Sequence, residues 1–214
     1  MNRTQVGRAG GRTAAALRPA RPADLAALRD FFAGLSAQTR YLRFFAPVTP
    51  SPALLHLLSG GTGPTYAVVA TRGDAIIGHA MAADRAGLRG ARTTDIGVVV
   101  ADAWQGQGVG SALVRALISR AQARGVTSLT MDVLPDNRQM LAMIAAHWTV
   151  ARRHRSADCV TIQVTLPVPV APLTRPSHAR SSRAKRRTST SATARATTTP
   201  ALTASSVMVR ATGT

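Results

Sequence analysis

The sequence predicts a mixed α/β domain followed by a basic tail, and three observations lead to this fold class. Between residues 13 and 166, runs of alternating apolar residues, typical of strands, are interspersed with apolar stripes at helical spacing. Three strand-like runs follow one another in the middle of the chain, so the order differs from a repeated strand–helix–strand series. All eight aromatic residues lie between Phe31 and Trp148, and Pro167 begins a low-complexity segment.

The first half of the domain is expected to contain one strand and three helical segments. The strand is Ala14–Arg18. Pro22-Ala-Asp24 opens the first helix, whose apolar stripe ends near Gly34, and residues 36–45 form the second helical segment. In the third, Thr49-Pro-Ser-Pro52 supplies an N-cap followed by proline at the first helical position, and a glycine pair ends the helix.

The second half is expected to combine six strands with two longer helices. The strand candidates are residues 65–71, 75–84, 92–100, 127–133, 147–153 and 158–166. Arg72-Gly-Asp74 is a tight turn between the first two, which predicts an antiparallel hairpin. The helices are predicted over Gln107–Arg124, before Gly125, and from the cap Leu134-Pro-Asp-Asn137 to the region of Ala146.

The net charge of +18 is concentrated at the ends of the chain. Residues 1–18 carry four arginines and no acid, and residues 167–214 carry eight basic residues and no acid. Because segments of this composition bury too little apolar area to fold, residues 1–12 and 167–214 are predicted to be disordered, and 13–166 to form the domain. The tail is expected to be solvated; because basic tails can neutralise phosphates, weak tail-mediated binding to nucleic acid or acidic surfaces is the alternative.

Composition excludes several other classes of protein. A single cysteine, Cys159, rules out a disulfide scaffold and a cysteine-built zinc site, and the histidines show no metal-ligand spacing. Cys159 lies in strand-like alternation and is expected to be a small buried residue. No apolar run approaches the roughly 18 residues of a membrane span. The default prediction is a cytoplasmic protein, monomeric or homodimeric, with an organelle transit peptide as the alternative for the basic N-terminus.

A glycine-rich loop is the most informative motif. The run Val98-Val-Val-Ala-Asp-Ala-Trp-Gln105-Gly-Gln-Gly-Val-Gly110-Ser places a strand, the loop and an amphipathic helix in succession. Glycines at positions 106, 108 and 110 leave the backbone free of Cβ atoms, so its N–H groups can face an anion, and the N-terminus of the helix adds a favourable dipole. The motif therefore predicts binding of a phosphate or pyrophosphate.

Four interpretations of this loop compete. A Walker loop requires Gly-Lys-Ser/Thr, and the only lysine, Lys185, lies in the tail. The dinucleotide fingerprint finds its first two glycines but has Ser111 at the third, and the further strand–helix units of that fold do not follow. A glycine turn that only joins strand to helix is the structural alternative. The fourth interpretation is the pattern Gln/Arg-x-x-Gly-x-Gly/Ala, matched by Gln105, Gly108 and Gly110.

The fourth pattern resembles the pyrophosphate loop of the GNAT superfamily of acetyl-CoA-dependent N-acetyltransferases. Further segments resemble the acetyltransferase domains of bacterial protein-lysine acetyltransferases: Leu17-Arg-Pro-Ala-Arg-Pro-Ala-Asp24, Leu35-Ser-x-x-Thr-Arg40-Tyr-Leu-Arg-Phe-Phe45 and Val133-Leu-x-x-Asn137-x-x-Met140. The resemblance spans about residues 14–166 and excludes the tail. It implies a GNAT-type fold, with a mostly antiparallel central sheet flanked by helices. It also implies acetyl transfer from acetyl-CoA, without a metal, to a primary amine that attacks directly in a ternary complex; the acceptor is a protein lysine or a small molecule.

The same resemblance implies which residues bind the cofactor. The strand at Val98, Val99 and Val100 would hold the pantetheine arm through its backbone. The pyrophosphate would be wrapped by Gln105, Gly106, Gln107, Gly108, Val109, Gly110 and Ser111. Asn137 would face the cofactor or order the adjoining loop.

Acetyl transfer also needs a proton acceptor, because an amine with a pKa of about 10 is mostly charged at neutral pH. The family usually places a glutamate on the strand before the glycine loop, and the matching residue is Asp95. Asp95 is therefore the expected base, with a bridging water because its side chain is one methylene shorter; an aspartate that only accepts local hydrogen bonds is the alternative. An oxyanion donor is implied near Val98. The chain departs from the family at Ile144, where no tyrosine acid stands nearby, and at His147-Trp148, which replaces the usual Gly-Phe.

Two questions stay open in the sequence. Arg40 and Arg43, flanked by aromatic residues, either form a basic lip over the substrate entrance or anchor the second helical segment. The domain itself is either an N-acetyltransferase, as the intact glycine loop favours, or a catalytically impaired GNAT-like module that binds nucleic acid or proteins. The high net charge and the aspartate at position 95 favour the second interpretation.

Overall fold

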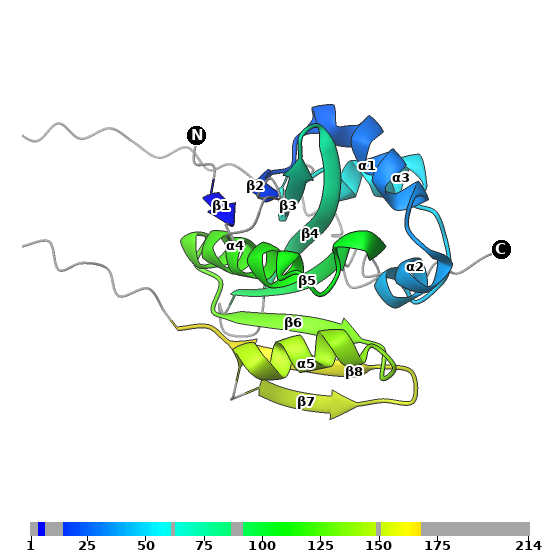
Figure 1. The fold of residues 1–214 in the computed structure, drawn as a ribbon. Helices are drawn as coiled ribbons and strands as arrows, with labels where there is room; N and C mark the ends of the chain where they lie inside the picture. The colour runs from blue at the N-terminus through cyan, green and yellow to red at the C-terminus, as the bar shows by residue number, and fades with distance from the viewer. Residues whose placement is uncertain (1–3, 7–14, 61–62, 87–91, 149–150, 168–214) are drawn as a thin grey trace, which may run out of the picture. The chain divides into compact units, whose positions relative to one another are not determined.

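The computed structural model describes residues 4–6, 15–60, 63–86, 92–148 and 151–167 of the 214-residue chain (Figure 1). The predicted disorder of residues 167–214 lies outside the described residues except for Pro167, and so does most of the predicted disordered segment 1–12. Thr4–Val6, however, form a short strand, β1, paired antiparallel with residues 15–17. This part of the prediction was wrong because an exposed sheet edge offers backbone partners that a composition-based argument does not consider.

The central element is an eight-stranded sheet among the described residues. Its other strands are β2 (Ala15–Pro19), β3 (Thr65–Arg72), β4 (Ala75–Ala86), β5 (Arg92–Val100), β6 (Ser128–Val133), β7 (Ala151–Arg155) and β8 (Val160–Thr165). The strand order is β1-β2-β3-β4-β5-β6-β8-β7, and every neighbouring pair is antiparallel except β5 with β6. The predicted mixed α/β fold, with its mostly antiparallel sheet and the β3–β4 hairpin, is confirmed.

Five α-helices flank this sheet in the described part of the chain. They are α1 (Leu25–Ala33), which follows a 3-10 turn at Pro22–Asp24, α2 (Ala37–Phe44), α3 (Pro52–Leu58), α4 (Val109–Ala123) and α5 (Arg138–His147). Polar side chains cap three of them: Ser36 accepts from the backbone N–H of Thr39, Ser51 from that of Leu54, and Asn137 from that of Met140. These caps explain why the predicted starts of these three helices agree with the observed ones to within one residue.

One predicted boundary was wrong. Residues 147–153 were expected to form a strand, but His147 is the last residue of α5 and the strand β7 begins at Ala151. The helix continues because the N–H of Trp148 donates to the carbonyl of Ile144 at 3.0 Å, and Nδ1 of His147 lies 2.9 Å from the carbonyl oxygen of Met143. These local bonds override the strand-like alternation of the sequence.

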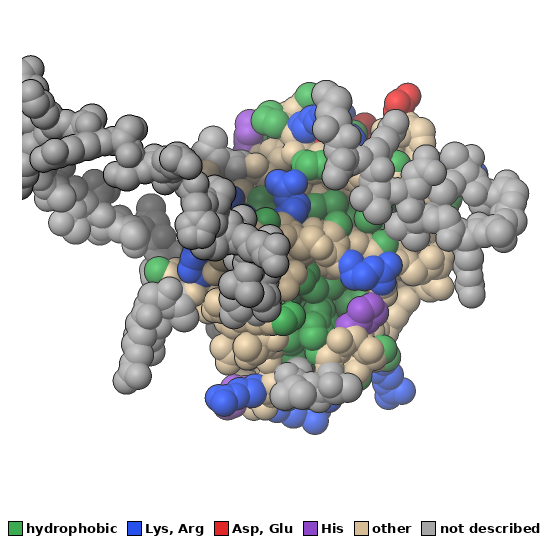
Figure 2. Space-filling view, turned by 90° about the vertical axis from the view of Figure 1, so that its left-hand side faces the viewer, with side chains coloured by type: hydrophobic (Ala, Val, Ile, Leu, Met, Phe, Trp, Pro, Cys, Tyr) green, Lys and Arg blue, Asp and Glu red, His purple; other side chains and the backbone are tan. Residues whose placement is uncertain are grey.

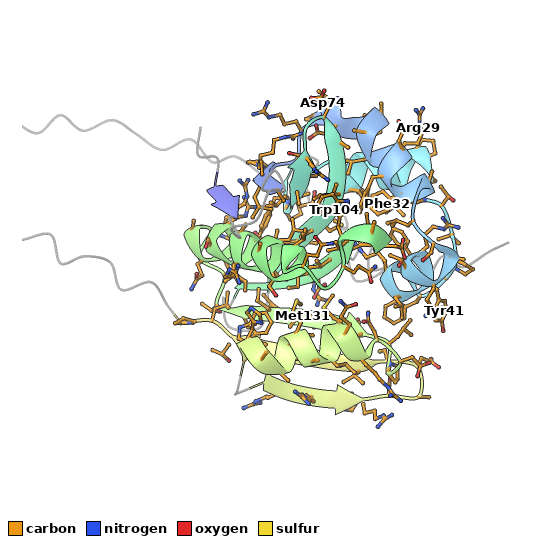
Figure 3. All side chains as sticks on the ribbon, viewed as in Figure 1. Arg29, Phe32, Tyr41, Asp74, Trp104 and Met131 are labelled. Atoms are coloured by element: carbon orange, nitrogen blue, oxygen red, sulfur yellow. The ribbon has the colours of Figure 1, made fainter. Side chains whose placement is uncertain are left out.

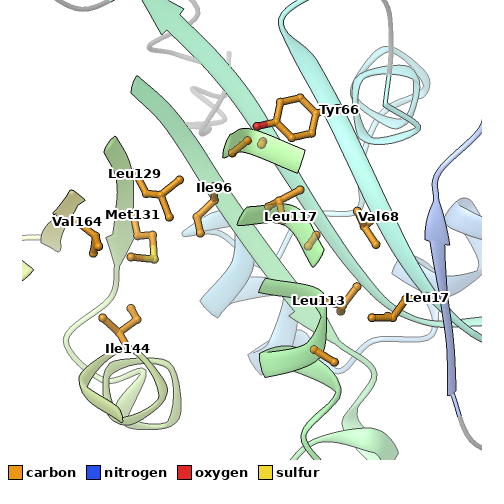
Figure 4. Packing of buried hydrophobic residues seen from close by; sticks show 14 of the residues in the cluster. Leu17, Tyr66, Val68, Ile96, Leu113, Leu117, Leu129, Met131, Ile144 and Val164 are labelled. Atoms are coloured by element: carbon orange, nitrogen blue, oxygen red, sulfur yellow. The ribbon is translucent and has the colours of Figure 1, made fainter. Parts of the chain in front are cut away.

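Helices cover the sheet on both faces and bury two hydrophobic clusters. On one face, Leu113 and Leu117 of α4 and Ile144 of α5 pack on strand residues such as Ile96 and Met131 (Figure 4). On the other face, α1 and α3 bury a second cluster against β3, β4 and β5, centred on the fully buried ring of Phe32. The two clusters fix the central strands and the helix α4, which carries the glycine loop at its N-terminus.

Gly78 sets how closely α4 approaches the sheet. A Cβ atom at this position of β4 would lie 2.9 Å from Cδ1 of Leu113 and 3.2 Å from Cγ1 of Val109. The missing side chain therefore allows the first turns of α4 to lie directly on β4. The start of α4, and the loop before it, are placed at the end of β5 as a result.

The strands β5 and β6 pair over only three residue pairs, from Thr93 with Ser128 to Asp95 with Thr130. Beyond Asp95, β5 continues its pairing with β4 as far as Val100, and β6 continues its pairing with β8 as far as Val133. The two strands therefore separate, and a gap opens in the sheet. Because the N–H of Ala101 donates to the carbonyl of Ile77 on β4, and alternate residues of a strand point to opposite edges, the backbone groups of Val98 and Val100 face this gap.

The described surface is basic. In the face shown in Figure 2, arginine side chains are distributed over the surface, whereas acidic side chains appear only near its upper edge. No helix among the described residues is long and apolar enough to cross a membrane.

Candidate functional site

A cavity of about 370 Å³ lies beside the end of β5, beyond the point where β5 stops pairing with β6. Its wall is formed by α2, the end of β5, the loop before α4, the first turn of α4 and the start of α5. Of the residues predicted to bind a cofactor, the following line it: Val98, Val99, Val100, Gln105, Gly106, Gly108, Gly110, Ser111 and Asn137. Arg43, for which the sequence left two roles open, also lines it, and the sequence argument missed six further lining residues: Thr39, Leu42, Trp104, Gln139, Met140 and Met143.

The glycine loop requires glycine for conformational reasons at two positions. Gly106 has φ 69° and Gly108, the N-cap of α4, has φ 81°, both in the left-handed region. The first intrahelical bond of α4 is donated by Ala112 to the carbonyl of Gly108, so the preceding amides of this 15-residue helix have no partner within it. Together with the helix dipole, they make this end of the cavity suited to an anion.

The side chain of Gln105 has a structural role. Its Nε2 donates to the backbone carbonyl of Val100 at 3.1 Å and to Oγ1 of Thr39 at 3.2 Å. The Thr39 hydroxyl in turn donates to the carboxylate of Asp102 at 2.7 Å, and Asp102 also accepts from the backbone N–H and the hydroxyl of Ser36. Burial raises the pKa of Asp102, but these hydrogen bonds outweigh it and hold the pKa below its ordinary value. The network ties the start of α2 to the glycine loop and uses the carbonyl of Val100.

Two predicted loop residues point away from the cavity. Gln107 is exposed, and its Nε2 donates to the carbonyl of Ala103 at 2.8 Å. The side chain of Val109 is buried in the core against β4. Any contact of Gln107 or Val109 with a ligand in the cavity would therefore come from the backbone.

A smaller cavity of about 40 Å³ adjoins the first one. The two share six lining residues: Leu42, Arg43, Val98, Asn137, Met140 and Met143. The smaller cavity lies between β5 and β6, because it is further lined by Ile96 and Gly97 of β5 and by Met131, Asp132 and Val133 of β6. Asn137 thus lies at the junction of both cavities, and its side chain also caps α5 through the N–H of Met140 at 3.1 Å.

Asp95 is close to the smaller cavity but does not line it. Its side chain is almost completely buried and forms an ion pair with Arg85 of β4. Burial raises the pKa of Asp95, the charge and hydrogen bond of Arg85 lower it, and the charge of Asp132 raises it further, with a net shift upward. The carboxylate lies at the last paired position before β5 and β6 separate.

The structure distinguishes Arg40 from Arg43, which the sequence could not. Nη1 of Arg40 donates to the carbonyls of Leu35 and Ala33, so this side chain anchors α2. The guanidinium of Arg43 instead lies on the backbone of Gly97 and lines both cavities. Burial lowers the pKa of Arg43 to about 10, which leaves the group cationic at neutral pH.

Cys159 lines neither of the two cavities. Cys159 is partly exposed in the turn before β8, with Oγ of Ser156 at 3.4 Å from its Sγ, so the expectation of a buried cysteine was wrong. Cys159 is not part of the strand, because β8 begins at the next residue, Val160. Trp104 (Figure 3) lines the larger cavity, and the guanidinium carbon of Arg72 lies 4.9 Å from the centre of its ring. No group of three potential metal ligands occurs in the part of the chain that the structure describes.

Comparison with known proteins agrees with this geometry. Residues 33–147 match the family model described as Acetyltransferase (GNAT) family. Acetyltransferase Pat of Mycolicibacterium smegmatis is 32% identical over 138 residues, which cover 62% of this chain and 41% of that protein. The chain therefore spans less than half the length of this curated relative.

Solved structures show the same fold. The GNAT domain of S. lividans PAT has 26% sequence identity and a TM-score of 0.63, over 72% of this chain and 92% of that one. A GNAT superfamily phosphinothricin acetyltransferase from Sinorhizobium meliloti, solved in complex with AcCoA, has 20% identity and a TM-score of 0.57, over 71% of this chain and 88% of that one. Because the Sinorhizobium meliloti protein is only 20% identical, its similarity shows a shared fold and nothing more.

Proposed function

The chain belongs to the acetyltransferase (GNAT) family, and from this membership we propose that it transfers an acetyl group from acetyl-CoA to a primary amine. The acceptor class is a protein lysine or a small amine. The observation that carries the proposal is the larger cavity beside the end of β5, which joins the glycine loop to the smaller cavity.

The residues present fit acetyl-CoA. The unpaired first-turn amides of α4 would hold the pyrophosphate, and Gly106 and Gly108 keep side chains away from it. The backbone groups of Val98 face the gap with no strand opposite, so they would pair with the amides of an extended pantetheine arm. The apolar side chains of Met140 and Met143 form the opposite wall. When bound, acetyl-CoA supplies an acyl thioester at the junction of the two cavities.

The residues of the smaller cavity favour direct attack by the amine. The described residues that line the two cavities include no cysteine, and Cys159 lies in the turn before β8, outside both linings. A covalent acyl-enzyme on cysteine therefore has no support, and both substrates would bind at once. We propose that Asp95 accepts the proton of the amine through a water, because its carboxylate lies beside the smaller cavity without lining it.

Two measurements test the proposed function. Calorimetry should show binding of acetyl-CoA to the full chain, and release of free thiol should follow when a panel of amines, amino acids and lysine-containing peptides is added. Binding without turnover on any acceptor would favour the alternative of a catalytically impaired module that binds nucleic acid or proteins. Absence of acetyl-CoA binding would refute the assignment of the cavity.

A further inference from the structure

Arg43 occupies the position where donor and acceptor would meet. Of the six residues shared by the two cavities, Arg43 alone carries a charge. If the larger cavity holds the donor and the smaller one receives the acceptor, the reacting carbonyl lies beside these shared residues. This step rests on the proposed function.

The guanidinium of Arg43 is a cation that has no counter-charge among the described residues. No carboxylate of the described residues forms an ion pair with it, and its Nε is buried without a hydrogen-bond partner. The nearest candidate on the same face of β5, Asp95, is held by Arg85. Arg43 is instead supported by the ring of Phe44, whose centre lies 5.0 Å from Cζ, and by the backbone of Gly97. A partly buried, unpaired charge is unfavourable for folding and is typical of functional sites.

We propose that Arg43 is a catalytic residue that stabilises negative charge on the reacting thioester, first on the carbonyl oxygen and then on the leaving sulfur. In the reaction, the amine nitrogen forms a bond to the acyl carbon and the carbon–sulfur bond breaks with its electron pair passing to sulfur. The proton lost by the nitrogen passes to Asp95 through water, and the products are the amide and a thiolate. Arg43 donates no proton; it supplies a fixed positive charge where the negative charge develops.

The residues that line the two cavities offer the leaving thiolate no acid, which supports a role for the positive charge of Arg43. On α5, the cavity-lining residues are Gln139, Met140 and Met143, none of which protonates a leaving thiolate. Among the described residues that line either cavity there is no tyrosine, histidine or lysine. A thiolate that leaves without an acid needs a cation nearby, and Arg43 is the only cationic side chain in this set.

Substitution of Arg43 gives the first test. With acetyl-CoA and the full chain, Arg43→Gln and Arg43→Met should lower kcat by about 100-fold, the effect typical of losing one such donor, and change the KM for acetyl-CoA little. Arg43→Lys should retain part of the rate, and added guanidinium ion should partly restore Arg43→Ala. The matched control is Arg115→Gln, which removes an exposed arginine of α4 and should leave kcat unchanged.

Gly97→Ala tests the position of the charge without removing it. The new Cβ would lie 2.7 Å from Cζ and Nη2 of Arg43, so the flexible guanidinium must move off the strand while the fold, checked by circular dichroism, is kept. The kcat of Gly97→Ala should fall by about tenfold or more, and the double variant with Arg43→Met should be no slower than Arg43→Met alone. Additive losses would mean that Gly97 acts independently of Arg43 and would contradict the proposal.

A spectroscopic test needs no acceptor. The thiol of bound CoA should titrate, by the ultraviolet absorbance of its thiolate, at a lower pH in the wild type than in Arg43→Gln. Equal thiol titrations, or an unchanged kcat in Arg43→Gln, would overturn the proposal. A rate loss confined to acceptors that carry a carboxylate would also overturn it, since Arg43 would then bind the acceptor. Failure of the proposed function would be seen separately, as a wild type that binds no acetyl-CoA.

Discussion

The buried histidine on β4 predicts that the protein loses stability in mild acid. His79 is completely buried, its Nε2 lies 2.7 Å from the carbonyl oxygen of Leu58, and its Nδ1 has no hydrogen-bond partner in the described part of the chain. Burial, with a smaller contribution from the charge of Arg43, lowers the pKa of His79 to about 4, although the hydrogen bond with the Leu58 carbonyl acts in the opposite direction. The ring edge lies against Phe32, with 5.5 Å between the ring centres, so the imidazole is packed as a neutral core residue.

The size of this loss of stability follows from the pKa values of His79 in the folded and unfolded states. In the unfolded chain a histidine titrates at about 6.5, so between pH 6.5 and pH 4 the unfolded state binds a proton that the folded state does not. Stability therefore falls as the pH falls through this window, by about 1.4 kcal/mol per pH unit and about 3 kcal/mol in total. Above pH 6.5 His79 is neutral in both states, so it causes no further change in the free energy of unfolding. A loss of this size is a large part of the 5–15 kcal/mol that is roughly typical of a domain.

Urea unfolding followed by circular dichroism between pH 7.5 and 4.5 measures this loss. His79→Gln removes the titration, while its amide N–H can still donate to the carbonyl of Leu58, so its stability should depend less on pH over this window. His56→Gln, at an exposed histidine, is the matched control and should follow the wild type. If His79→Gln and the wild type lose the same free energy of unfolding between pH 6.5 and 4.5, the argument from burial fails.

Four further predictions follow from the site and the core. Gly108→Asp should weaken acetyl-CoA binding by about tenfold or more, or about 1.4 kcal/mol, in calorimetry. The control is Gly125→Asp, at a glycine that has a similar φ of 77° but lies outside the cavities, and it should not weaken binding. Equal losses of affinity in the two variants would refute the assignment of a phosphate site. Asp95→Asn should lower kcat by about 100-fold with acetyl-CoA affinity nearly unchanged, and full activity would exclude it as the base. Gly78→Ala should lower the free energy of unfolding, measured in urea, by about 1–3 kcal/mol, because its Cβ would lie 2.9 Å from Cδ1 of Leu113. An unchanged unfolding midpoint would show that α4 shifts freely. A chain ending at Pro167 should keep its melting temperature and its KM for acetyl-CoA, because the described sheet and the cavities lie before that residue; unfolding of the shorter chain would refute this.

Most elements of the fold could be predicted because their ends are determined by neighbouring residues. Ser51 followed by Pro52 starts α3, and the amide of Asn137 caps α5, through bonds that span only a few residues. The strand β1 could not be predicted, because it depends on pairing with residues 15–17 rather than on its own composition. His147 was assigned to a strand because alternation alone does not show where a helix ends.

The site was predictable to the extent that it is built from one segment. The glycine loop and Val98–Val100 are contiguous in sequence, and the structure places most of this run around the larger cavity. Thr39 and Arg43 come from a helix some sixty residues earlier, and only the packing of α2 on β5 brings them there. The pairing of Asp95 with Arg85 depends on the register of β4 with β5, which the sequence does not specify.

The separation of β5 from β6 gives the sheet an additional edge in its interior. Exposed edges are where sheets exchange amide hydrogens fastest and where foreign strands add. At Val98 this edge is reached through the cavity, so a narrow extended ligand would act as a substitute strand between the two parts of the sheet. Binding of such a ligand would then be linked to folding, and the protection of the Val98 amide would rise with ligand concentration. In the free protein, β5 and β6 are joined by only three residue pairs, as are β1 and β2 at the edge, so within the interior of the sheet this junction would open first.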